Sequence, residues 1–233
     1  MKNRIKLYNF FYGKNYDNLY KGLSGFFFNQ AHKNLEKLNY ISNFVKNSNR
    51  RKKKLFLEIG PGRRLHYDYL TDKNKIFKYF YLDTNLKNIK FLKKIYKNDN
   101  LFVHLKKTSH IKKNSLDRII CSHVLEHVSN PEEFILYYYK FLKKNGTFSI
   151  TLPCDPGLFW RIGRLYNYFT FWKSKGVSKK EYYYHMAHEH INPIKNLISI
   201  IKYNFKNYSE SFLPFKLRST NLNLMYNVVI FKK

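Results

Sequence analysis

The sequence contains only two cysteines, Cys121 and Cys154, so it cannot build a framework of disulfides. It also lacks any run of about 20 apolar residues, the length that a membrane-spanning helix requires. The basic start at residues 1–6 is not followed by the apolar core of a signal peptide. These absences argue against a secreted disulfide scaffold and against a membrane span, and we expect a cytoplasmic protein.

Acidic residues are also scarce: 15 Asp and Glu oppose 44 Lys and Arg, which gives a net charge of +29. A basic surface can attract nucleic acid or anionic lipid. However, only nine of the basic residues are Arg, the residue that phosphate sites favour, and residues 50–54 form the one true cluster. Lys accompanies abundant Asn, Tyr, Phe and Ile, as AT-rich codons would supply. We therefore interpret the charge as mainly compositional and do not favour a nucleic-acid partner.

The chain is long enough, at 233 residues, for one packed α/β domain with modest additions. Short apolar runs alternate with amphipathic stretches, which predicts βαβ units and a parallel sheet. The predicted strands are residues 55–59, 78–82, 101–105, 116–121, 147–152, 209–213 and 224–231. The predicted helices are residues 62–74, 85–97, 131–144 and 193–203, preceded by one or two helices within residues 19–49.

The first predicted strand ends in the turn Glu58-Ile59-Gly60-Pro61-Gly62. Its glycines let the backbone turn tightly and approach a ligand closely. Asp83 ends the next strand, where a carboxylate can accept hydrogen bonds from both hydroxyls of a ribose. Taken singly, the glycines could form a plain turn and Asp83 could cap a helix. The third glycine of the dinucleotide fingerprint is absent, because Leu65 holds its place, and this disfavours a NAD-dependent enzyme.

The order of these segments resembles class I S-adenosylmethionine (SAM)-dependent methyltransferases of the type 11/23-like group. The resemblance covers residues 55–153, and its motifs lie at residues 57–62, 81–83, 115–128 and 143–153. It implies an α/β, Rossmann-like fold with a seven-stranded, mostly parallel sheet and helices on both faces. Within this single domain we expect an N-terminal helical extension (1–54), a SAM-binding core (55–153), a lid after the fifth strand (154–192) and a C-terminal helix with two strands (193–233).

The resemblance also assigns residues to the parts of the cofactor. Glu58, Gly60 and Gly62 are implied to hold the methionine portion. Asp83 is implied to hold the ribose. The backbone around Cys121, Ser122 and His123 is implied to line the methyl-donor end. One position departs from the family pattern, which usually has an Asp after the third strand to contact adenine. Leu105 stands near that place, so adenine recognition would fall to backbone groups or to His104.

A second sequence motif, typical of metal sites, follows the fourth predicted strand. His123 to His127 matches His-x-x-Glu-His, a signature of inverted zinc proteases, in which two histidines on one helical face bind Zn²⁺. Here the motif directly follows a buried strand and stops at Ser129-Asn130-Pro131, which leaves little helix. Because a motif needs its structural context, we favour the methyltransferase interpretation and expect no metal site.

Methyl transfer to a hydroxyl needs a base, and an imidazole suits that role near neutral pH. Residues 185–190 supply three histidines around Glu189. We predict His190 as the base, with His123 and His188 behind it. The plainer alternative is that these residues form a polar helix end before Pro193.

The predicted lid is rich in aromatic and basic residues. Its aromatic rings could stack on a sugar or on bases, and its positive charge suits an anionic, phosphorylated or lipid-linked acceptor. Residues 188–197 and 212–215 resemble, more loosely, methyltransferases of bacterial surface-polysaccharide and sugar modification, which implies a small-molecule or glycan-type acceptor with an oxygen or nitrogen nucleophile. A packed amphipathic lid with solvated lysines is the plainer alternative.

Two other functions are also compatible with the sequence. An RNA methyltransferase would account for the charge and the cluster at residues 50–54, although no RNA-binding module or Asn/Asp-Pro-Pro-Tyr/Phe motif is present. A non-catalytic methyltransferase-like domain would account for Leu105 in place of the usual Asp.

Overall fold

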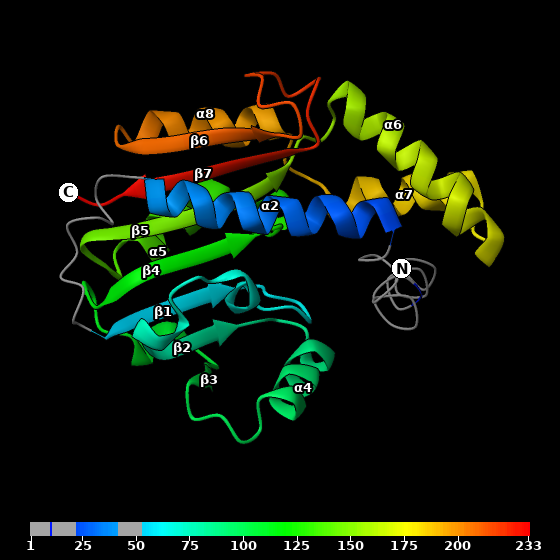
Figure 1. The fold of residues 1–233 in the computed structure, drawn as a ribbon. Helices are drawn as coiled ribbons and strands as arrows, with labels where there is room; N and C mark the ends of the chain where they lie inside the picture. Colours follow the sequence, from blue (N-terminus) through cyan, green and yellow to red (C-terminus); the bar gives the residue numbers. More distant parts are fainter. Residues whose placement is uncertain (1–9, 11–21, 42–52) are drawn as a thin grey trace.

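The computed structural model describes residue 10 and residues 22–41 and 53–233 (Figure 1). Seven strands form one sheet in the order β3-β2-β1-β4-β5-β7-β6, parallel except for β7, which runs antiparallel to β5 and β6. The strands are β1 (Lys54–Ile59), β2 (Ile76–Leu82), β3 (Phe102–His104), β4 (Leu116–Ser122), β5 (Leu142–Pro153), β6 (Tyr208–Leu213) and β7 (Met225–Phe231). The predicted Rossmann-like α/β fold is confirmed.

Six α-helices are present among the described residues. They are α2 (Gly22–Ile41), α4 (Leu86–Ile95), α5 (Pro131–Tyr139), α6 (Leu158–Asn167), α7 (Lys179–Glu189) and α8 (Ile194–Asn204). Local sequence explains where several of them begin. The side chain of Asn85 accepts a hydrogen bond from Lys87 N at the start of α4, and Asn130 with Pro131 starts α5 in the same way.

Two predicted helices differ from the structure. The helix expected at 62–74 is replaced by two 3-10 turns, at His66–Tyr69 and Lys73–Lys75. Tertiary bonds fix the first turn: Glu58 accepts the N–H of His66, and Tyr69 donates to Asn29 of α2 at 2.5 Å. The helix expected to run to residue 144 ends at Tyr139, because β5 already begins at Leu142.

The two faces of the sheet are covered differently (Figure 1). On the face covered by α5 and α8, alternate strand residues such as Phe148, Ile150 and Leu152 form the largest apolar core. On the face crossed by α2, the intervening positions of β5 are Ser149 and its neighbouring threonines, all buried. The period-two alternation of the strands therefore separates an apolar face from a polar one.

A buried network of hydrogen bonds attaches α2 to this polar face. Arg118 of β4 donates to Glu36 of α2 at 2.5 Å and to Ser149 at 2.9 Å. Burial would raise the pKa of Glu36, but Arg118 and His66 outweigh it and lower that pKa to about 2. Asn227 of β7 adds a bond to the carbonyl oxygen of Ala31. Residues 42–52, which complete the predicted N-terminal helical segment, lie outside the described residues.

The segment after β5 lies past the carboxyl ends of the parallel strands (Figure 1). It contains α6, a π-helix (Tyr168–Trp172), a 3-10 turn (Lys173–Lys175) and α7, which begins with a capping box between Ser178 and Glu181. Its buried residues Tyr168, Trp172, Val177 and Tyr182 form a small core of their own. The boundaries predicted for this lid and for the other segments stay predictions. No helix among the described residues has the length and apolarity to cross a membrane.

Candidate functional site

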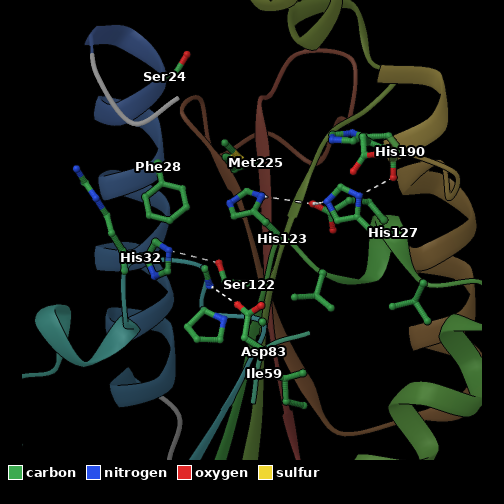
Figure 2. Close-up of a pocket in the computed structure, with 18 of the residues that line it drawn as sticks. Ser24, Phe28, His32, Ile59, Asp83, Ser122, His123, His127, His190 and Met225 are labelled. Carbon is green, nitrogen blue, oxygen red and sulfur yellow. Dashed lines mark hydrogen bonds and ion pairs between the residues drawn. The ribbon is translucent and has the colours of Figure 1, made fainter. Parts of the chain in front are cut away.

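A cavity of about 1420 Å³ opens at the carboxyl ends of the parallel strands. The loops after β1, β2 and β4 form its floor, α2 forms one wall, and α6 and α7 form the opposite wall (Figure 2). Ligands of open parallel sheets bind at this edge. Of the residues predicted from the sequence, the cavity lining includes Glu58, Gly60, Gly62, Asp83, Ser122, His123 and His190.

The glycine turn has the backbone that its sequence predicts. Gly60 and Gly62 have φ values of +62° and +63°, a region that favours glycine. A Cβ built on Gly60 would lie 2.5 Å from Cγ2 of Val124, which no real Cβ tolerates. The N–H of Gly60 donates to Leu82 O at 2.7 Å, which joins the turn to the end of β2. The turn is therefore a cradle from which side chains are excluded.

Asp83 is held beside this cradle. Its carboxylate accepts the N–H of Gly62 at 3.0 Å and the N–H of Asn85 at 2.7 Å. Burial raises the pKa of Asp83, and the hydrogen bonds from Asn85, Gly62 and Asn88 partly offset this effect. Two carboxylate oxygens offer about four acceptor positions, so acceptor capacity remains for the hydroxyls of a ribose.

Glu58 lies beneath the turn, and its side chain is engaged by the protein. Both carboxylate oxygens accept the N–H of His66 at 2.9 Å, and one also accepts the hydroxyl of Tyr79 at 2.7 Å. Burial raises the pKa of Glu58 to about 8, although these two donors oppose the rise. The geometry gives Glu58 the role of holding the loop after β1; direct contact with a methionine group stays a prediction.

Three predicted cofactor residues do not line the cavity with their side chains. Leu105 donates its N–H to Tyr81 O and turns its side chain into the apolar core, and the ring of His104 packs against Tyr81. Cys121 is also fully buried in that core, and burial raises the pKa of its thiol. Residues 106–109 line the cavity in the place expected for His104 and Leu105.

His123 occupies a strained position just after β4. Its φ is +56°, which is uncommon for a residue with a Cβ, and its ring stacks on Phe28 of α2 with centroids 5.4 Å apart. Nδ1 of His123 lies 3.6 Å from Oε1 of Glu126. Strain of this kind concentrates at functional sites, because the surrounding structure must hold it in place.

The lid side of the cavity brings together residues from three loops. Asp155, after β5, contacts Nδ1 of His190 at 2.8 Å, and Arg164 of α6 donates to the same carboxylate. Nδ1 of His127 donates to the backbone oxygen of Glu189. The rings of His127 and His190 meet edge to face, with centroids 5.1 Å apart. The predicted base is therefore oriented by a carboxylate.

Glu126 is the buried carboxylate of this group. Burial would raise its pKa, but the contact with His123 and the neighbouring imidazoles of His127 and His190 outweigh it and lower the pKa to about 2. By contrast, His188 is exposed on α7, packs against Tyr184 and does not line the cavity. Helical spacing explains the difference, because His188 falls on the outer side of the last turn of α7.

The basic residues of the lid lie mostly on its outside. Arg164 lines the cavity and is paired with Asp155. The other basic lid residues, which are exposed and do not line the cavity, are Arg161, Lys173, Lys175, Lys179 and Lys180. This arrangement agrees with the solvated face that was the plainer interpretation of the lid charge.

The contribution of α2 to the cavity was not predicted from the sequence. Phe28 and His32 line the cavity, and His32 joins Ser122 to His66 through contacts of 3.4 and 2.7 Å. Burial and the neighbouring His66 lower the pKa of His32 well below its usual value. Helical spacing was the available signal, because residues 28, 32 and 36 follow one another at intervals of four along the buried side.

The comparisons with known proteins agree with this geometry. Residues 57–150 match a family model described as a methyltransferase domain. Residues 57–150 of this chain are thus similar to the methyltransferase family. Its cofactor is SAM, and the chain is a SAM-dependent methyltransferase. No curated protein sequence matches the chain.

Solved methyltransferases share the fold at low sequence identity. The plantazolicin methyltransferase BpumL in complex with SAH is 13% identical, with a TM-score of 0.60, over 99% of this chain and 95% of that chain. The DszA carbon methyltransferase is 14% identical, with a TM-score of 0.64, over 97% and 60% of the two chains. The CurJ carbon methyltransferase is 10% identical, with a TM-score of 0.57, over 86% and 53%. This chain therefore spans about half the length of the CurJ structure.

The residues present fit SAM. The cradle at Gly60 leaves room where a Cβ would clash, and Asp83 retains acceptor capacity for the ribose. Ser122 and His123 border the same space at the end of β4. Leu105 belongs to the core and does not line the cavity, so its side chain is not placed to contact adenine.

Proposed function

We propose that this methyltransferase acts on an oxygen or nitrogen atom of a small-molecule or glycan-type acceptor held between the strand ends and the lid. The observation that carries the proposal is the pairing of His190 with Asp155 at 2.8 Å on the cavity wall. A carboxylate that holds one imidazole nitrogen leaves the other free to accept a proton, as an oxygen or nitrogen acceptor requires.

SAM, when bound, would supply a sulfonium methyl group whose S–C bonding electrons stay on sulfur. The proton of the acceptor atom would pass to a base of the chain. Two imidazoles of the cavity are suited to accept the proton. His190 is oriented by Asp155, and His123 lies at the end of β4 beside the predicted methyl-donor end.

The cavity walls support an acceptor with flat or sugar-like faces. Its aromatic lining includes Phe27, Phe28, Phe159, Trp160, Tyr166 and Tyr182. Aromatic rings stack on sugar faces and on planar heterocycles. The cationic side chains of Arg64, Lys106 and Lys107 also line the cavity and would favour an anionic acceptor, such as a phosphorylated or lipid-linked sugar.

Methyl-labelled SAM tests the proposal. The full chain is incubated with labelled SAM and with separated pools of small molecules and glycans, of RNA and of protein. We expect the label in the small-molecule or glycan pool, as an O-methyl or N-methyl group in mass spectra of the hydrolysed product. Label in the RNA pool would favour the RNA methyltransferase alternative, and a C-methyl product would exclude a heteroatom acceptor.

His123→Asn and His190→Asn variants identify the base. Loss of the base should lower turnover by about 100-fold while the affinity for SAM stays unchanged. An equal fall in SAM affinity would instead indicate a structural role.

A further inference from the structure

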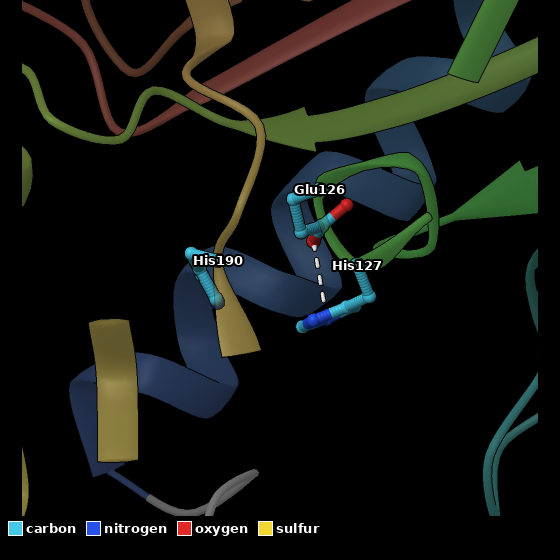
Figure 3. Close-up of side chains that lie close together, drawn as sticks. All are labelled: Glu126, His127 and His190. Carbon is cyan, nitrogen blue, oxygen red and sulfur yellow. Dashed lines mark ion pairs between the residues drawn. The ribbon is translucent and has the colours of Figure 1, made fainter. Parts of the chain in front are cut away.

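We propose that Glu126, His127 and His190 bind a divalent transition-metal ion at the acceptor side of the cavity. These three residues offer two imidazole nitrogens and a carboxylate oxygen, all within 4.8 Å of one another (Figure 3). The sequence motif pointed to His123 and His127 as metal ligands on one helix. In the structure the group consists instead of Glu126 and His127 from one loop and His190 from another.

The hydrogen bonds of both imidazoles leave the same nitrogen available. Nδ1 of His127 faces the backbone oxygen of Glu189, which can only accept, so this nitrogen carries a proton. Nδ1 of His190 likewise donates to the carboxylate of Asp155. In a neutral imidazole the lone pair then lies on Nε2. Metal-binding histidines are held in this way, with the other ring nitrogen donating to a carboxylate or a backbone carbonyl.

Glu126 supplies an independent observation. Its side chain is 2% exposed, and one of its carboxylate oxygens has no hydrogen-bond partner among the described residues. A buried carboxylate oxygen without a partner is costly. The unpartnered oxygen is Oε2. Oε1 faces the imidazoles: it lies 3.8 Å from Nε2 of His127 and 3.6 Å from Nδ1 of His123, both too far for a hydrogen bond, and an ion could lie between Oε1 and Nε2 of His127. A cation would satisfy the carboxylate and both lone pairs together.

The two loops that carry these residues are joined by backbone hydrogen bonds. The carbonyl oxygen of Glu126 accepts the N–H groups of Ile191 and Asn192, and the Asn192 side chain donates to the carbonyls of Leu125 and Val128. Ligand atoms around a tetrahedral ion lie about 3.3 Å apart, so the three ligand atoms, which lie within 4.8 Å of one another, must approach slightly when an ion binds. The backbone bonds between the two loops already hold them close to this arrangement.

The donor set indicates the class of metal. Two imidazoles and one carboxylate suit Zn²⁺, Co²⁺, Mn²⁺ or Fe²⁺, whereas Mg²⁺ and Ca²⁺ prefer oxygen ligands alone. Three protein ligands leave a coordination position for an acceptor hydroxyl, whose pKa the ion would lower. This consequence rests on the proposed function, while the binding itself does not. With an ion bound, His190 would be a ligand and His123, the second imidazole named under the proposed function, would accept the proton; without an ion, His190 keeps that role.

Metal binding is measured on the full chain, freed of metal by a chelator and titrated with Co²⁺ and Zn²⁺. We expect one equivalent of Co²⁺ per chain, with a visible absorption spectrum that Zn²⁺ displaces. His127→Ala and Glu126→Gln should each weaken binding at least about tenfold. His110→Ala, which removes an exposed histidine outside the group, should leave binding unchanged.

The variants must keep their far-UV circular dichroism and their SAM affinity, so that a loss of binding is not a loss of fold. The Glu126→Gln substitution keeps the shape of a buried side chain, and His127→Ala changes a partly exposed one, so at least the second is expected to fold. Absence of stoichiometric binding by the parent chain, binding by both variants as tight as that of the parent, or loss of binding in His188→Ala would overturn the site. None of these outcomes bears on the acceptor pool that receives labelled methyl groups, so the two proposals fail separately.

Discussion

The part of the cavity that we propose binds SAM, the cofactor half, consists of turns at the ends of neighbouring strands. The part that we propose binds the acceptor, the acceptor half, consists of side chains from loops far apart in the sequence. Gly60, Gly62 and Asp83 lie within 24 residues and are joined by backbone amides. Glu126, Asp155 and His190 come from three separate loops and meet through their side chains. Backbone conformation should therefore decide SAM binding, and side-chain chemistry should decide turnover.

The largest expected effect is that of Gly60→Ala on SAM affinity. The new Cβ would meet Val124 at 2.5 Å and would hold a φ of +62°, so the turn must move. We expect SAM affinity measured by calorimetry to fall by about 100-fold or more. Gly176→Ala is the matched control, because its φ is +76° and nothing lies within 4 Å of its Cβ. If both variants bind SAM equally, the cradle does not contact the cofactor.

Asp83→Ala should have the next largest effect. If the Asp83 carboxylate accepts two ribose hydroxyls, as we propose, its removal should weaken SAM binding by about 10- to 100-fold, at roughly 1.5–3 kcal/mol for hydrogen bonds to a charged group. Asp99→Ala is the control, because Asp99 accepts the N–H of Leu101 on a loop outside the cavity. Unchanged SAM affinity in the Asp83 variant would remove the ribose role. It would also indicate that SAM affinity depends on the glycine turn and not on Asp83.

The same contrast explains how much the sequence could predict. Strand order, the glycine turn and Asp83 follow from local patterns, because a parallel sheet places successive strand ends at one edge. His190 was predicted from its neighbours in the sequence. Its partner Asp155 was not, because no helical or strand periodicity relates residues that are 35 positions apart. The sequence did not show that His104 and Leu105 lie outside the cavity lining, because the register that sets the face of a strand residue is fixed by pairing with β2. Glu36 of α2 meets Arg118 only through tertiary packing.

A third prediction concerns the acceptor half. Asp155→Asn keeps the shape of the side chain but removes the charge that orients His190, so turnover should fall by about tenfold. SAM affinity should not change, because Asp155 does not line the cavity. Steady-state kinetics with calorimetry separate the two quantities. Glu181→Gln, at the start of α7, is the control for a general loosening of the lid. A parallel loss of SAM affinity in Asp155→Asn would mean that the two halves are not independent.

Glu58→Gln should have the smallest effect on SAM affinity. It tests whether Glu58 acts through its negative charge or only through the hydrogen bonds that its side chain accepts. The pKa of Glu58 is about 8 in the fold and 4.5 when exposed, so the folded state holds a proton that the unfolded state releases. The free energy of unfolding should therefore fall as pH rises from 4.5 to 8, by at most about 1.4 kcal/mol per pH unit. The Gln variant lacks this fall, so its stability relative to the parent should rise over that range in urea titrations.

SAM affinity of the same variant then decides what Glu58 does. The Gln side chain can still accept from His66 and Tyr79, which fixes the loop after β1. We expect SAM affinity to stay within about threefold of the parent at pH 7, since a protonated Glu58 offers the methionine group no charge. A much larger loss would show that Glu58 contacts the cofactor directly as a carboxylate. The cofactor half would then depend on side-chain charge as well as on backbone, and the contrast with the acceptor half would weaken.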